Sequence, residues 1–303
     1  MTKTIDFKQI THVFRHATFD KKLTTIYSHA EEIIGYLKNF SLENQPSNFI
    51  KNYVQDAIAR FLHTLSLIPY KDNGTLLEIG SNPYLLTILI KKIFNYKITS
   101  TNFFDHNIYL KKTKDITQSI TNHKYNESYK FNSIGLNIEH IPYPFKTATF
   151  DTVLFCEVLE HLIINPLSVF SEFYRILKKG GQLIITTPNA ARLTNIATIL
   201  KGENIFDLYH PENGVYGRHN REFILQELKK LVTDNNFKIK YCKTHDRFDY
   251  NLINIYTVGY HGIKKTFYKK NDLISNLKLI NANTQNLGDN IYLVCQKPSV
   301  NQQ

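Results

Sequence analysis

Apolar residues recur at steps of three and four along much of the first 70 residues. Two stretches carry this spacing with no internal proline, LTTIYSHAEEIIGYLKNF (residues 23–40) and NFIKNYVQDAIARFLHTL (residues 48–65). An α-helix has about 3.6 residues per turn, so this spacing gathers the apolar side chains on one helix face. The pattern predicts an N-terminal helical cap over residues 1–70.

From Thr75 onward the pattern changes to short β-rich runs that alternate with helical stretches. The runs are TLLEIG (75–80), YKITSTNF (96–103), FDTVLFCEV (150–158), GQLIITTP (181–188), KIKYCKTH (238–245) and NIYLVCQKP (290–298). Strands that alternate with helices are typical of parallel sheets with helices on both faces. The sequence therefore predicts an α/β domain over residues 71–303, built on a doubly wound, mostly parallel sheet.

Two amphipathic stretches lie between these later runs, PLSVFSEFYRILKKGG (166–181) and NREFILQELKKLVTDNNF (220–237). The first is predicted to end at its Gly-Gly pair, with Lys178 and Lys179 in the last helical turn, where cations favour the helix dipole. Insertions are expected at about 189–219 and 246–289. The second insertion is long and aromatic, which makes it a lid candidate.

Composition narrows the classes of function. Apolar residues make up 42% and charged residues 21% of the 303, as in folded globular proteins. The chain has no long apolar run and no signal-peptide core, so we expect a cytoplasmic protein with no membrane span. Cys156, Cys242 and Cys295 form no CxxC pair, which fits a reducing compartment. The oligomeric state cannot be predicted from this sequence.

The net charge of +11 leaves a nucleic-acid partner open. The lysines are spread along the chain, however, and no arginine-rich stripe interleaved with aromatic residues is present. Nucleic acid is therefore a possible partner but not the favoured one.

The run LLEIGSNPYLLT (residues 76–87) is the candidate cofactor loop. At the carboxyl end of a first parallel strand, a ligand can approach the backbone only where side chains leave room, and Gly80 leaves that room. Ser81 and Asn82 are small and can form hydrogen bonds. An ordinary strand-to-helix turn is the alternative, and a dinucleotide site is disfavoured because it needs further glycines.

A second candidate position follows the second predicted strand. An acid or amide is expected there to bind the ribose hydroxyls of a nucleoside. Asn102 lies nearer the predicted strand end, whereas Asp105 is the better acceptor. Both residues stay open as candidates, and each could instead be a solvated turn residue.

The block FDTVLFCEVLEHL (residues 150–162), followed by RILKKGGQLIITTPN (residues 175–189), resembles class I S-adenosylmethionine-dependent methyltransferases with the pattern FDxVxxxEVLEHL. The resemblance extends from about Thr75 to the C-terminus. It implies a seven-stranded Rossmann-like sheet, S-adenosylmethionine as the cofactor and methyl transfer as the activity.

The same resemblance implies roles for individual residues. Asn137 matches the polar residue that faces the adenine amino group, and Ile138 matches the apolar residue that packs on the adenine ring. Cys156 and Glu157 lie beside the expected position of the sulfonium. The implied cofactor-binding residues are Glu78, Gly80, Ser81, Asn82, Asn102, Asp105, Asn137, Ile138, Cys156 and Glu157.

One departure from the family pattern concerns the cofactor loop. Asn82 and Tyr84 stand where the family usually has glycines. If the ring of Tyr84 points into the pocket, it blocks the cofactor; if it turns back onto the following helix, the path along the backbone stays open. A catalytically silent binding module with this fold is therefore an alternative function.

The stretch NIFDLYHPENGVYGRHNREF (residues 204–223) holds the candidate catalytic residues. Its end resembles the G-R-H-x-R-E-F/Y segment of some uncharacterised bacterial methyltransferases of this class. Arg218 and Arg221 could bind a phosphate, carboxylate or sugar, and His219 could accept a proton. In the equally weighted alternative, Asn220 caps the next helix and the basic residues form surface or internal salt bridges.

We predict a structural role for one further histidine and no metal site at the others. His161 belongs to the strand signature but begins a helix, so we expect it to be a structural hydrogen bonder. The spacing of His210, Glu212 and His219 fits no metal-binding pattern, and no metal is expected.

The favoured function is O-methylation of a small or glycan-like acceptor. A nucleic-acid methyltransferase is the first alternative, although the run that begins at Phe150 ends in CEVLEH (residues 156–161) and not in an N-P-P-Y or D-P-P-Y tetrapeptide for exocyclic base amines. A dehydrogenase is less favoured still, because only the first glycine of its motif is present.

Overall fold

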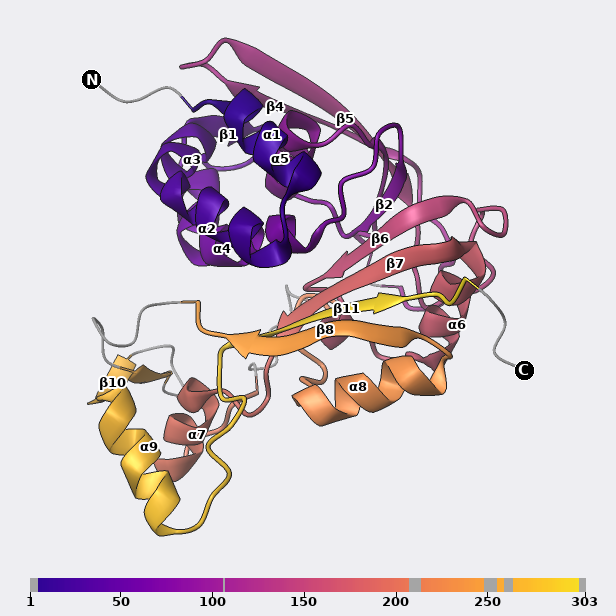
Figure 1. Ribbon diagram of the computed structural model, residues 1–303. Coiled ribbons are helices and arrows are strands. Elements are labelled where there is room, and N and C mark those ends of the chain that lie inside the picture. Colours follow the sequence, from indigo (N-terminus) through magenta and orange to yellow (C-terminus); the bar gives the residue numbers. More distant parts are fainter. Residues whose placement is uncertain (1–4, 106, 207–213, 248–254, 259–263, 300–303) are drawn as a thin grey trace.

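The computed structural model describes residues 5–105, 107–206, 214–247, 255–258 and 264–299 (Figure 1). Nine strands of these residues form one sheet in the order β1-β4-β5-β3-β2-β6-β7-β11-β8. In that order the strands span Phe40–Leu42, Ile116–Asn122, Glu127–Gly135, Lys97–Asn102, Thr75–Ile79, Phe150–Cys156, Leu177–Pro188, Asn290–Gln296 and Lys238–His245. None of the described helices is long and apolar enough to cross a bilayer.

The central strands run in one direction. β3 and β6 both pair in parallel with β2, and β5 and β7 continue the parallel pairing on either side. β11 is antiparallel to both β7 and β8, so β8 runs the same way as β7. The seven strands from β5 to β8 confirm the predicted doubly wound, mostly parallel sheet. β4 and β1, which the sequence did not predict, extend it by antiparallel pairing at one edge.

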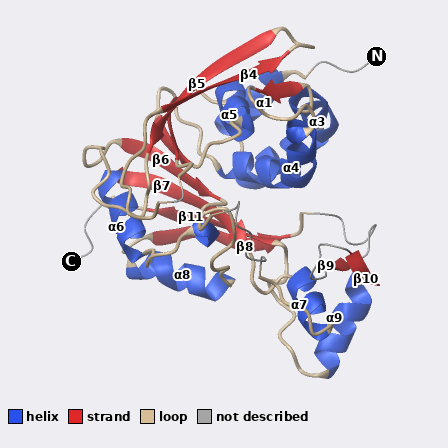
Figure 2. Cartoon of the chain, turned by 180° about the vertical axis from the view of Figure 1, so that it is seen from behind, coloured by secondary structure: helices blue, strands red, loops and turns tan. Residues whose placement is uncertain are grey.

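Helices cover both faces of this sheet (Figure 2). α1 (Phe7–His16), α2 (Phe19–Ser28), α3 (Ala30–Leu37), α4 (Phe49–Leu67) and α5 (Leu85–Ile93) lie on one side, and α6 (Leu167–Ile176) and α8 (Leu225–Asp234) lie on the other. Along β2, β6, β7 and β11, side chains alternate between these two cores.

The pairs Leu76 and Leu77 on β2, and Leu154 and Val153 on β6, show this alternation. Leu76 and Leu154 belong to the core shared with the N-terminal helices, whereas Leu77 and Val153 belong to the core beneath α6 and α8. A parallel sheet buried on both faces requires such continuous apolar runs. The N-terminal helices therefore share one apolar core with the sheet.

The two predicted insertions contribute to one small lobe beyond the end of β8 (Figure 1). α7 (Leu193–Leu200) comes from the first insertion, and α9 (Lys270–Leu279) comes from the second. Leu193, Ala197, Leu273 and Leu277 form their shared apolar cluster. β9 (Ile255–Val258) and β10 (Lys264–Tyr268) form a two-stranded sheet in the same region. Parts of the lid candidate lie outside the described residues.

Helix boundaries differ from the sequence predictions at several places. α6 ends at Ile176 and β7 begins at once, so Lys178 and Lys179 lie in a strand rather than in the last helical turn. Nζ of Lys178 is bonded to Oδ2 of Asp151 at 2.8 Å, a contact that this strand position allows. The predicted helix over 23–40 is divided into α2 and α3 at His29.

Candidate functional site

The loop after β2 brings the chain backbone to the carboxyl edge of the sheet. Gly80 adopts φ +69°, and a Cβ atom there would lie 2.6 Å from Cγ2 of Val158. Its N–H donates to the carbonyl of Thr101 at 2.9 Å, and the N–H of Ser81 donates to the same oxygen at 3.3 Å. The left-handed backbone conformation and the close approach of Val158 together restrict this position to glycine.

Tyr84 turns away from the space beside Gly80. Its side chain is fully buried and its ring stacks on Phe131, with centroids 4.6 Å apart and an interplanar angle of 7°. Its hydroxyl bonds Oε1 of Gln118 at 3.0 Å and Oγ of Ser133 at 2.9 Å. The ring thus packs against β5, and Tyr84 lines neither of the cavities that the described residues form next to the loop.

Two adjoining cavities lie at this edge of the sheet, of about 220 Å³ and about 100 Å³. They share Ile79, Gly80, Asn82 and Glu157 in their walls. Beyond the shared wall, the larger cavity extends towards the ends of β3 and β5, and the smaller one extends towards α4. A bent ligand with one group on each side of Gly80 fits this arrangement.

All predicted cofactor-binding residues except Asp105 line one cavity or both. Asn102, Asn137 and Ile138 line the larger cavity, and Glu78, Ser81 and Cys156 line the smaller one, while Gly80, Asn82 and Glu157 line both. Asp105 lines neither, and its carboxylate accepts the N–H of Asn107 at 2.8 Å. Of the two candidates for the ribose position, only Asn102 therefore borders the cavity.

Asn102 also braces the loop. Its Oδ1 accepts the N–H of Asn82 at 3.0 Å, and its Nδ2 lies 3.1 Å from Oγ of Ser81 and 3.0 Å from Oγ of Ser133. The side chain is buried, with 3% of its surface exposed. Its amide therefore holds the loop in shape as well as bordering the cavity.

Three aromatic residues that the sequence did not single out as cofactor-binding line the larger cavity: Phe103, Phe104 and Tyr216. The rings of Phe103 and Tyr216 meet at 90° with centroids 5.6 Å apart. Asn137 donates from Nδ2 to the Tyr216 hydroxyl at 3.0 Å, and that hydroxyl donates to Oε2 of Glu139 at 2.9 Å. Burial of the hydroxyl raises the pKa of Tyr216 to about 12. Phe103 directly follows the polar residue at the end of β3, which is the signal that could have identified it.

Two acids, the buried Glu78 and the partly exposed Glu157, and the arginine Arg60 line the smaller cavity. Burial raises the pKa of Glu78 to about 7, although the hydroxyl of Thr87 donates to it at 2.6 Å. Arg60, which comes from α4, donates from Nη1 to Oε2 of Glu157 at 3.1 Å. The sequence offered no signal for Arg60, because only tertiary folding brings α4 to this edge.

Cys156 lies in the same wall at the end of β6. Burial raises the pKa of its thiol to about 12. A thiol with so high a pKa stays protonated near neutral pH, so it can shape the wall of the site but is a poor nucleophile.

Glu157 directly follows Cys156 and adopts φ 53°. Its carboxylate accepts the Thr186 hydroxyl at 2.8 Å and Nδ2 of Asn290 at 3.1 Å. These bonds, added to the one from Arg60, hold the carboxylate between the two cavities.

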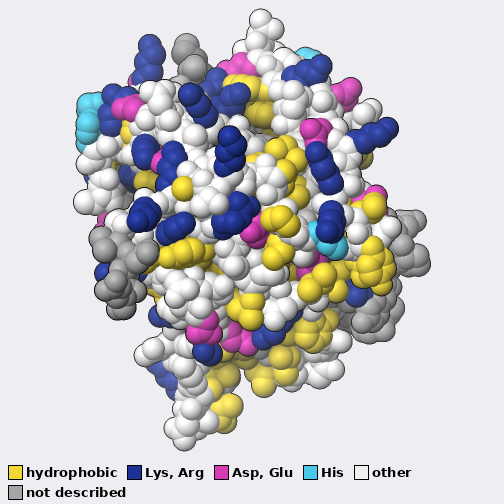
Figure 3. All heavy atoms as spheres, turned by 90° about the vertical axis from the view of Figure 1, so that its right-hand side faces the viewer, with side chains coloured by type: hydrophobic (Ala, Val, Ile, Leu, Met, Phe, Trp, Pro, Cys, Tyr) yellow, Lys and Arg dark blue, Asp and Glu magenta, His cyan; other side chains and the backbone are white. Residues whose placement is uncertain are grey.

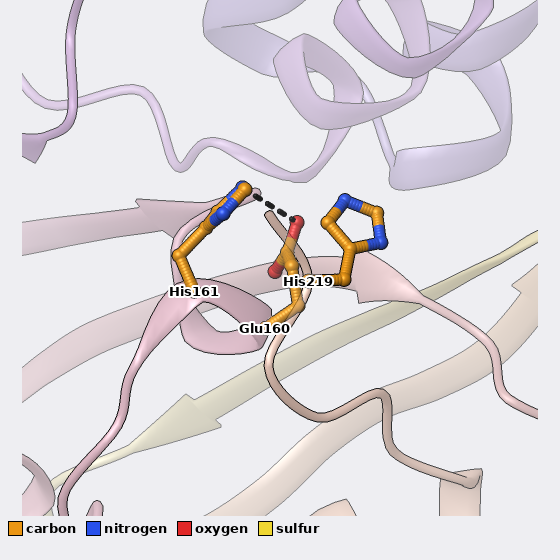
Figure 4. Close-up of side chains that lie close together, drawn as sticks. All are labelled: Glu160, His161 and His219. Carbon is orange, nitrogen blue, oxygen red and sulfur yellow. Dashed lines mark ion pairs between the residues drawn. The ribbon is translucent and has the colours of Figure 1, made fainter. Parts of the chain in front are cut away.

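Three further titratable side chains converge next to this wall, Glu160, His161 and His219 (Figure 4). Glu160 and His161 end the short 3₁₀ helix η1 (Leu159–His161), and His219 lies on the segment 214–223. That segment is bonded to η1 at several points. The N–H of Asn220 donates to the Glu160 carbonyl at 2.7 Å, and Nδ1 of His161 donates to the carbonyl of Arg218 at 2.9 Å.

These contacts decide two of the sequence interpretations. Nδ2 of Asn220 donates to the carbonyls of His161 and Val215, so Asn220 ties the segment to η1 and caps no helix. α8 begins only at Leu225. His161 forms a structural hydrogen bond, as expected, and it also lines the larger cavity.

His219 donates from Nδ1 to Oε1 of Glu222 at 2.9 Å. Burial opposes ionisation of Glu222, but the hydrogen bonds from His219 and Arg192 outweigh it and lower the pKa of this carboxyl to about 2. Glu222 is therefore a carboxylate that orients the imidazole, an arrangement suited to general base catalysis.

The two candidate arginines occupy different surroundings. Arg221 is exposed and pairs with Glu227 of α8 at 2.9 Å, as in the salt-bridge interpretation. Nε of Arg218 donates to Oδ1 of Asn220 at 3.0 Å. Neither arginine lines the two cavities of the described residues, so their role in acceptor binding stays a prediction. His210 and Glu212 lie outside the described residues.

Comparisons with known proteins identify the kind of domain that forms these cavities. A family model described as a methyltransferase domain matches residues 50–241. An uncharacterised protein of Methanocaldococcus jannaschii is 40% identical over 83 residues, which are 27% of this chain and 32% of that protein. The mitochondrial ubiquinone biosynthesis O-methyltransferase of Dictyostelium discoideum is 27% identical over 167 residues, 54% of this chain and 49% of that protein. The chain thus spans about a third to a half of these relatives.

Among solved structures, a chain in the complex between the Haloferax volcanii Trm112 methyltransferase activator and a methyltransferase is similar, with a TM-score of 0.50. The identity is 12%, and the match covers 88% of this chain and 98% of that chain. At this identity the likeness shows the fold alone. The family model begins within α4, so the matched region includes Arg60.

Proposed function

This chain belongs to the methyltransferase-domain family, its domain is an S-adenosylmethionine-dependent methyltransferase, and we propose that its acceptor atom is an oxygen. The acceptor is a small molecule or a glycan-like molecule that carries a hydroxyl. The observation that carries this proposal is the His219–Glu222 pair. The ring of His219 contacts that of His161, and His161 lines the larger cavity.

The two cavities suit the two halves of the cofactor. The larger one, with Phe103, Asn137 and Ile138 in its walls, suits the adenosine half, because aromatic and apolar side chains pack on a base and an amide can bond its edge. The smaller one suits the methionine half. There Glu78 offers an acceptor to the amino group, and Arg60 offers a donor to the carboxylate.

A sulfonium methyl group is already activated, so the protein mainly has to align the acceptor with it and exclude water. A hydroxyl acceptor must also lose its proton. The imidazole of His219, held by the carboxylate of Glu222, can accept that proton through Nε2. The relative from Dictyostelium is named as an O-methyltransferase, which supports the same acceptor atom.

The alternative of a silent binding module rested on the ring of Tyr84. That ring is stacked on Phe131 and borders neither described cavity, which favours a working cofactor site. No observation favours nucleic acid in the same way. On the face drawn in Figure 3, the lysine and arginine side chains are spread among apolar and acidic ones and form no single basic patch.

The test of this proposal uses S-adenosylmethionine labelled with ¹³C in its methyl group. The purified protein is incubated with matched acceptors, such as a catechol and the corresponding aminophenol, and with a reducing sugar and its amino-sugar counterpart. The ¹³C shift of the transferred methyl distinguishes oxygen from nitrogen. We expect methyl ethers, formed more than tenfold more slowly by a His219→Gln variant. Methylamines as the dominant product would contradict the proposal.

A further inference from the structure

The cluster of Glu160, His161 and His219 has features that the methyl-transfer chemistry alone does not require. One ligand atom from each residue lies within 4.8 Å of the others. Figure 4 shows the three side chains pointing towards one another, and Nε2 of His161 lies 3.9 Å from Oε1 of Glu160. Two imidazoles and one carboxylate that face a common point can together bind a divalent transition-metal ion.

The outer contacts fix which nitrogen each ring turns inward. Nδ1 of His161 faces the carbonyl of Arg218, and Nδ1 of His219 faces the carboxylate of Glu222. A carbonyl and a carboxylate only accept, so both Nδ1 atoms carry protons. In the neutral rings, the lone pair is then on Nε2. A ligating histidine with its other N–H bonded to a carboxylate or carbonyl is the usual second layer of a metal site.

The third ligand is oriented in the same way. The Thr187 hydroxyl donates to Oε2 of Glu160 at 3.0 Å, which leaves Oε1 on the side of His161. Glu160 is 1% exposed, and among the described residues no lysine or arginine nitrogen lies within 4 Å of its carboxylate. Burial disfavours the ionised form of this carboxyl, and a cation in the cluster would stabilise that form.

We propose that Glu160, His161 and His219 form a binding site for a divalent transition-metal ion at the wall of the larger cavity. Metal–nitrogen and metal–oxygen bonds of about 2.0–2.2 Å place neighbouring ligands about 3–3.5 Å apart, so the three side chains close in by about 1 Å on binding. Three protein ligands leave further coordination positions open. Because His161 lines the cavity, these positions are accessible to a ligand there.

The catalytic use of the ion, unlike its binding, rests on the proposed oxygen acceptor. An acceptor hydroxyl bound at an open position has a lowered pKa and loses its proton to water. The oxygen then forms its bond to the methyl carbon, the carbon–sulfur bond breaks, and its electron pair stays on sulfur in S-adenosylhomocysteine. With the ion bound, Nε2 of His219 is a ligand; without it, the same nitrogen can serve as the base.

Metal binding can be measured without cofactor or acceptor. Untagged full-length protein is first treated with a chelator, and Zn²⁺, Mn²⁺ and Mg²⁺ are then titrated separately by calorimetry. We expect one site that binds Zn²⁺ at micromolar concentrations or below and binds Mg²⁺ far more weakly, since imidazole ligands disfavour Mg²⁺. Co²⁺ bound in place of Zn²⁺ should add visible absorption bands that report its coordination.

Variants separate this site from other histidines. Glu160→Gln and His219→Ala should weaken Zn²⁺ binding at least 100-fold, and Glu222→Gln, which changes a positioning residue, should weaken it about tenfold and shift the Co²⁺ spectrum. His16→Ala is the control, because it breaks the pair with His12 on α1, whose rings are 5.7 Å apart. Thermal melting of each metal-free variant verifies folding.

Two results would overturn the inference: no Zn²⁺ binding at about 1 mM by the native protein, or binding that Glu160→Gln and His219→Ala leave unchanged. Failure of the proposed function looks different. If the protein binds Zn²⁺ at this cluster but methylates nitrogen, the metal site is supported and the proposed oxygen acceptor is wrong. If it forms methyl ethers but binds no metal, the oxygen acceptor is supported and the proposed metal site is wrong.

Discussion

At the amino ends of β2 and β6, the buried carboxylate of Asp151 is surrounded by donors. Lys71 and Lys178 pair with it, and the N–H and hydroxyl of Thr75 each donate to it at 2.9 Å. Burial opposes ionisation, but these donors outweigh it and hold the pKa of Asp151 well below its usual range. At their carboxyl ends, on the other edge of the sheet, the same two strands lie among acids whose pKa values are raised.

At the carboxyl ends, burial raises the pKa of Glu78 to about 7, and burial with the neighbouring charge of Glu157 raises the pKa of Glu160 to about 8. The structural edge of the sheet compensates its acid with lysines, whereas the cavity edge keeps two acids buried beside a space for ligands. S-adenosylmethionine carries a sulfonium and an ammonium group, so an acidic wall complements it. Carboxyl pKa values that are raised rather than lowered thus distinguish the cavity edge from the structural one.

The largest effect on cofactor binding is expected from filling the cavity edge. Gly80→Leu should weaken S-adenosylmethionine binding at least 100-fold, about 2.7 kcal/mol, because a Cβ there already lies 2.6 Å from Val158. Calorimetric titration measures the loss. Gly35→Leu on α3 is the matched control, since a Cβ at Gly35 meets nothing within 4 Å. Native affinity in the Gly80 variant would show that the cofactor does not pass this loop.

Replacing the acid at the end of β2 should change how stability depends on pH. The pKa of Glu78 rises from 4.5 to about 7 on folding, so the native protein loses stability as the pH rises between these values, by about 3 kcal/mol in total. Glu78→Gln removes that loss. Relative to the native protein, the variant should gain about 3 kcal/mol between pH 4.5 and about pH 8.

Urea unfolding across this pH range measures the gain. Glu31→Gln, which changes an exposed acid on α3, should keep the native pH dependence. A constant difference between the Glu78 variant and the native protein at every pH would contradict the prediction, and would remove Glu78 from the contrast between the two edges.

Replacing the acid at the opposite edge should have the reverse sign. Asp151→Asn weakens the contacts with Lys71 and Lys178, and we expect a loss of about 2 kcal/mol at neutral pH, limited because both lysines are partly exposed. The depressed pKa of Asp151 stabilises the fold above the unfolded value of 3.8, and this stabilisation fades as the pH falls through the folded value.

The deficit of the Asp151 variant should therefore be constant down to about pH 4 and shrink below it. Urea unfolding of variant and native protein at matched pH values measures this difference. A variant as stable as the native protein at neutral pH would indicate that the two lysines contribute little at this edge.

The smallest effect is expected from Tyr84→Phe. The variant loses the hydroxyl bonds to Gln118 and Ser133, which should lower the free energy of unfolding by about 1 kcal/mol. Because the ring borders neither described cavity, affinity for S-adenosylmethionine should stay within about threefold of the native value. A larger change in affinity would mean that this side chain does reach the cofactor.

Local sequence patterns predicted much of the sheet. β8 matches the expected run over 238–245, and β2, β3, β6 and β11 lie within theirs. Buried parallel strands need continuous apolar residues, so residues close together in the sequence indicate where these strands lie. β1 was missed because its three residues follow a helix and pair with a strand more than 70 positions away, in a register that no local pattern records.

Long-range contacts decided what the local patterns left open. The sequence kept Asn102 and Asp105 as equal candidates, and only Asn102 borders the cavity and braces the loop. It suggested Asn220 as a helix cap, and tertiary packing uses that side chain to tie the segment 214–223 to η1. Arg60 reaches Glu157 across 97 positions of sequence. Such contacts depend on how helices and loops pack after the sheet has formed.

By itself, the sequence determined the positions of most central strands, the glycine at the cofactor loop and the methyltransferase resemblance of the block over 150–162, because each depends on residues close together in the chain. The tertiary structure alone decided that Tyr84 leaves the cavity open and that Glu160, His161 and His219 converge. The reason is physical: backbone preferences and apolar periodicity act over a few residues, whereas a pocket and its charges are formed by side chains that meet only when separate elements pack together.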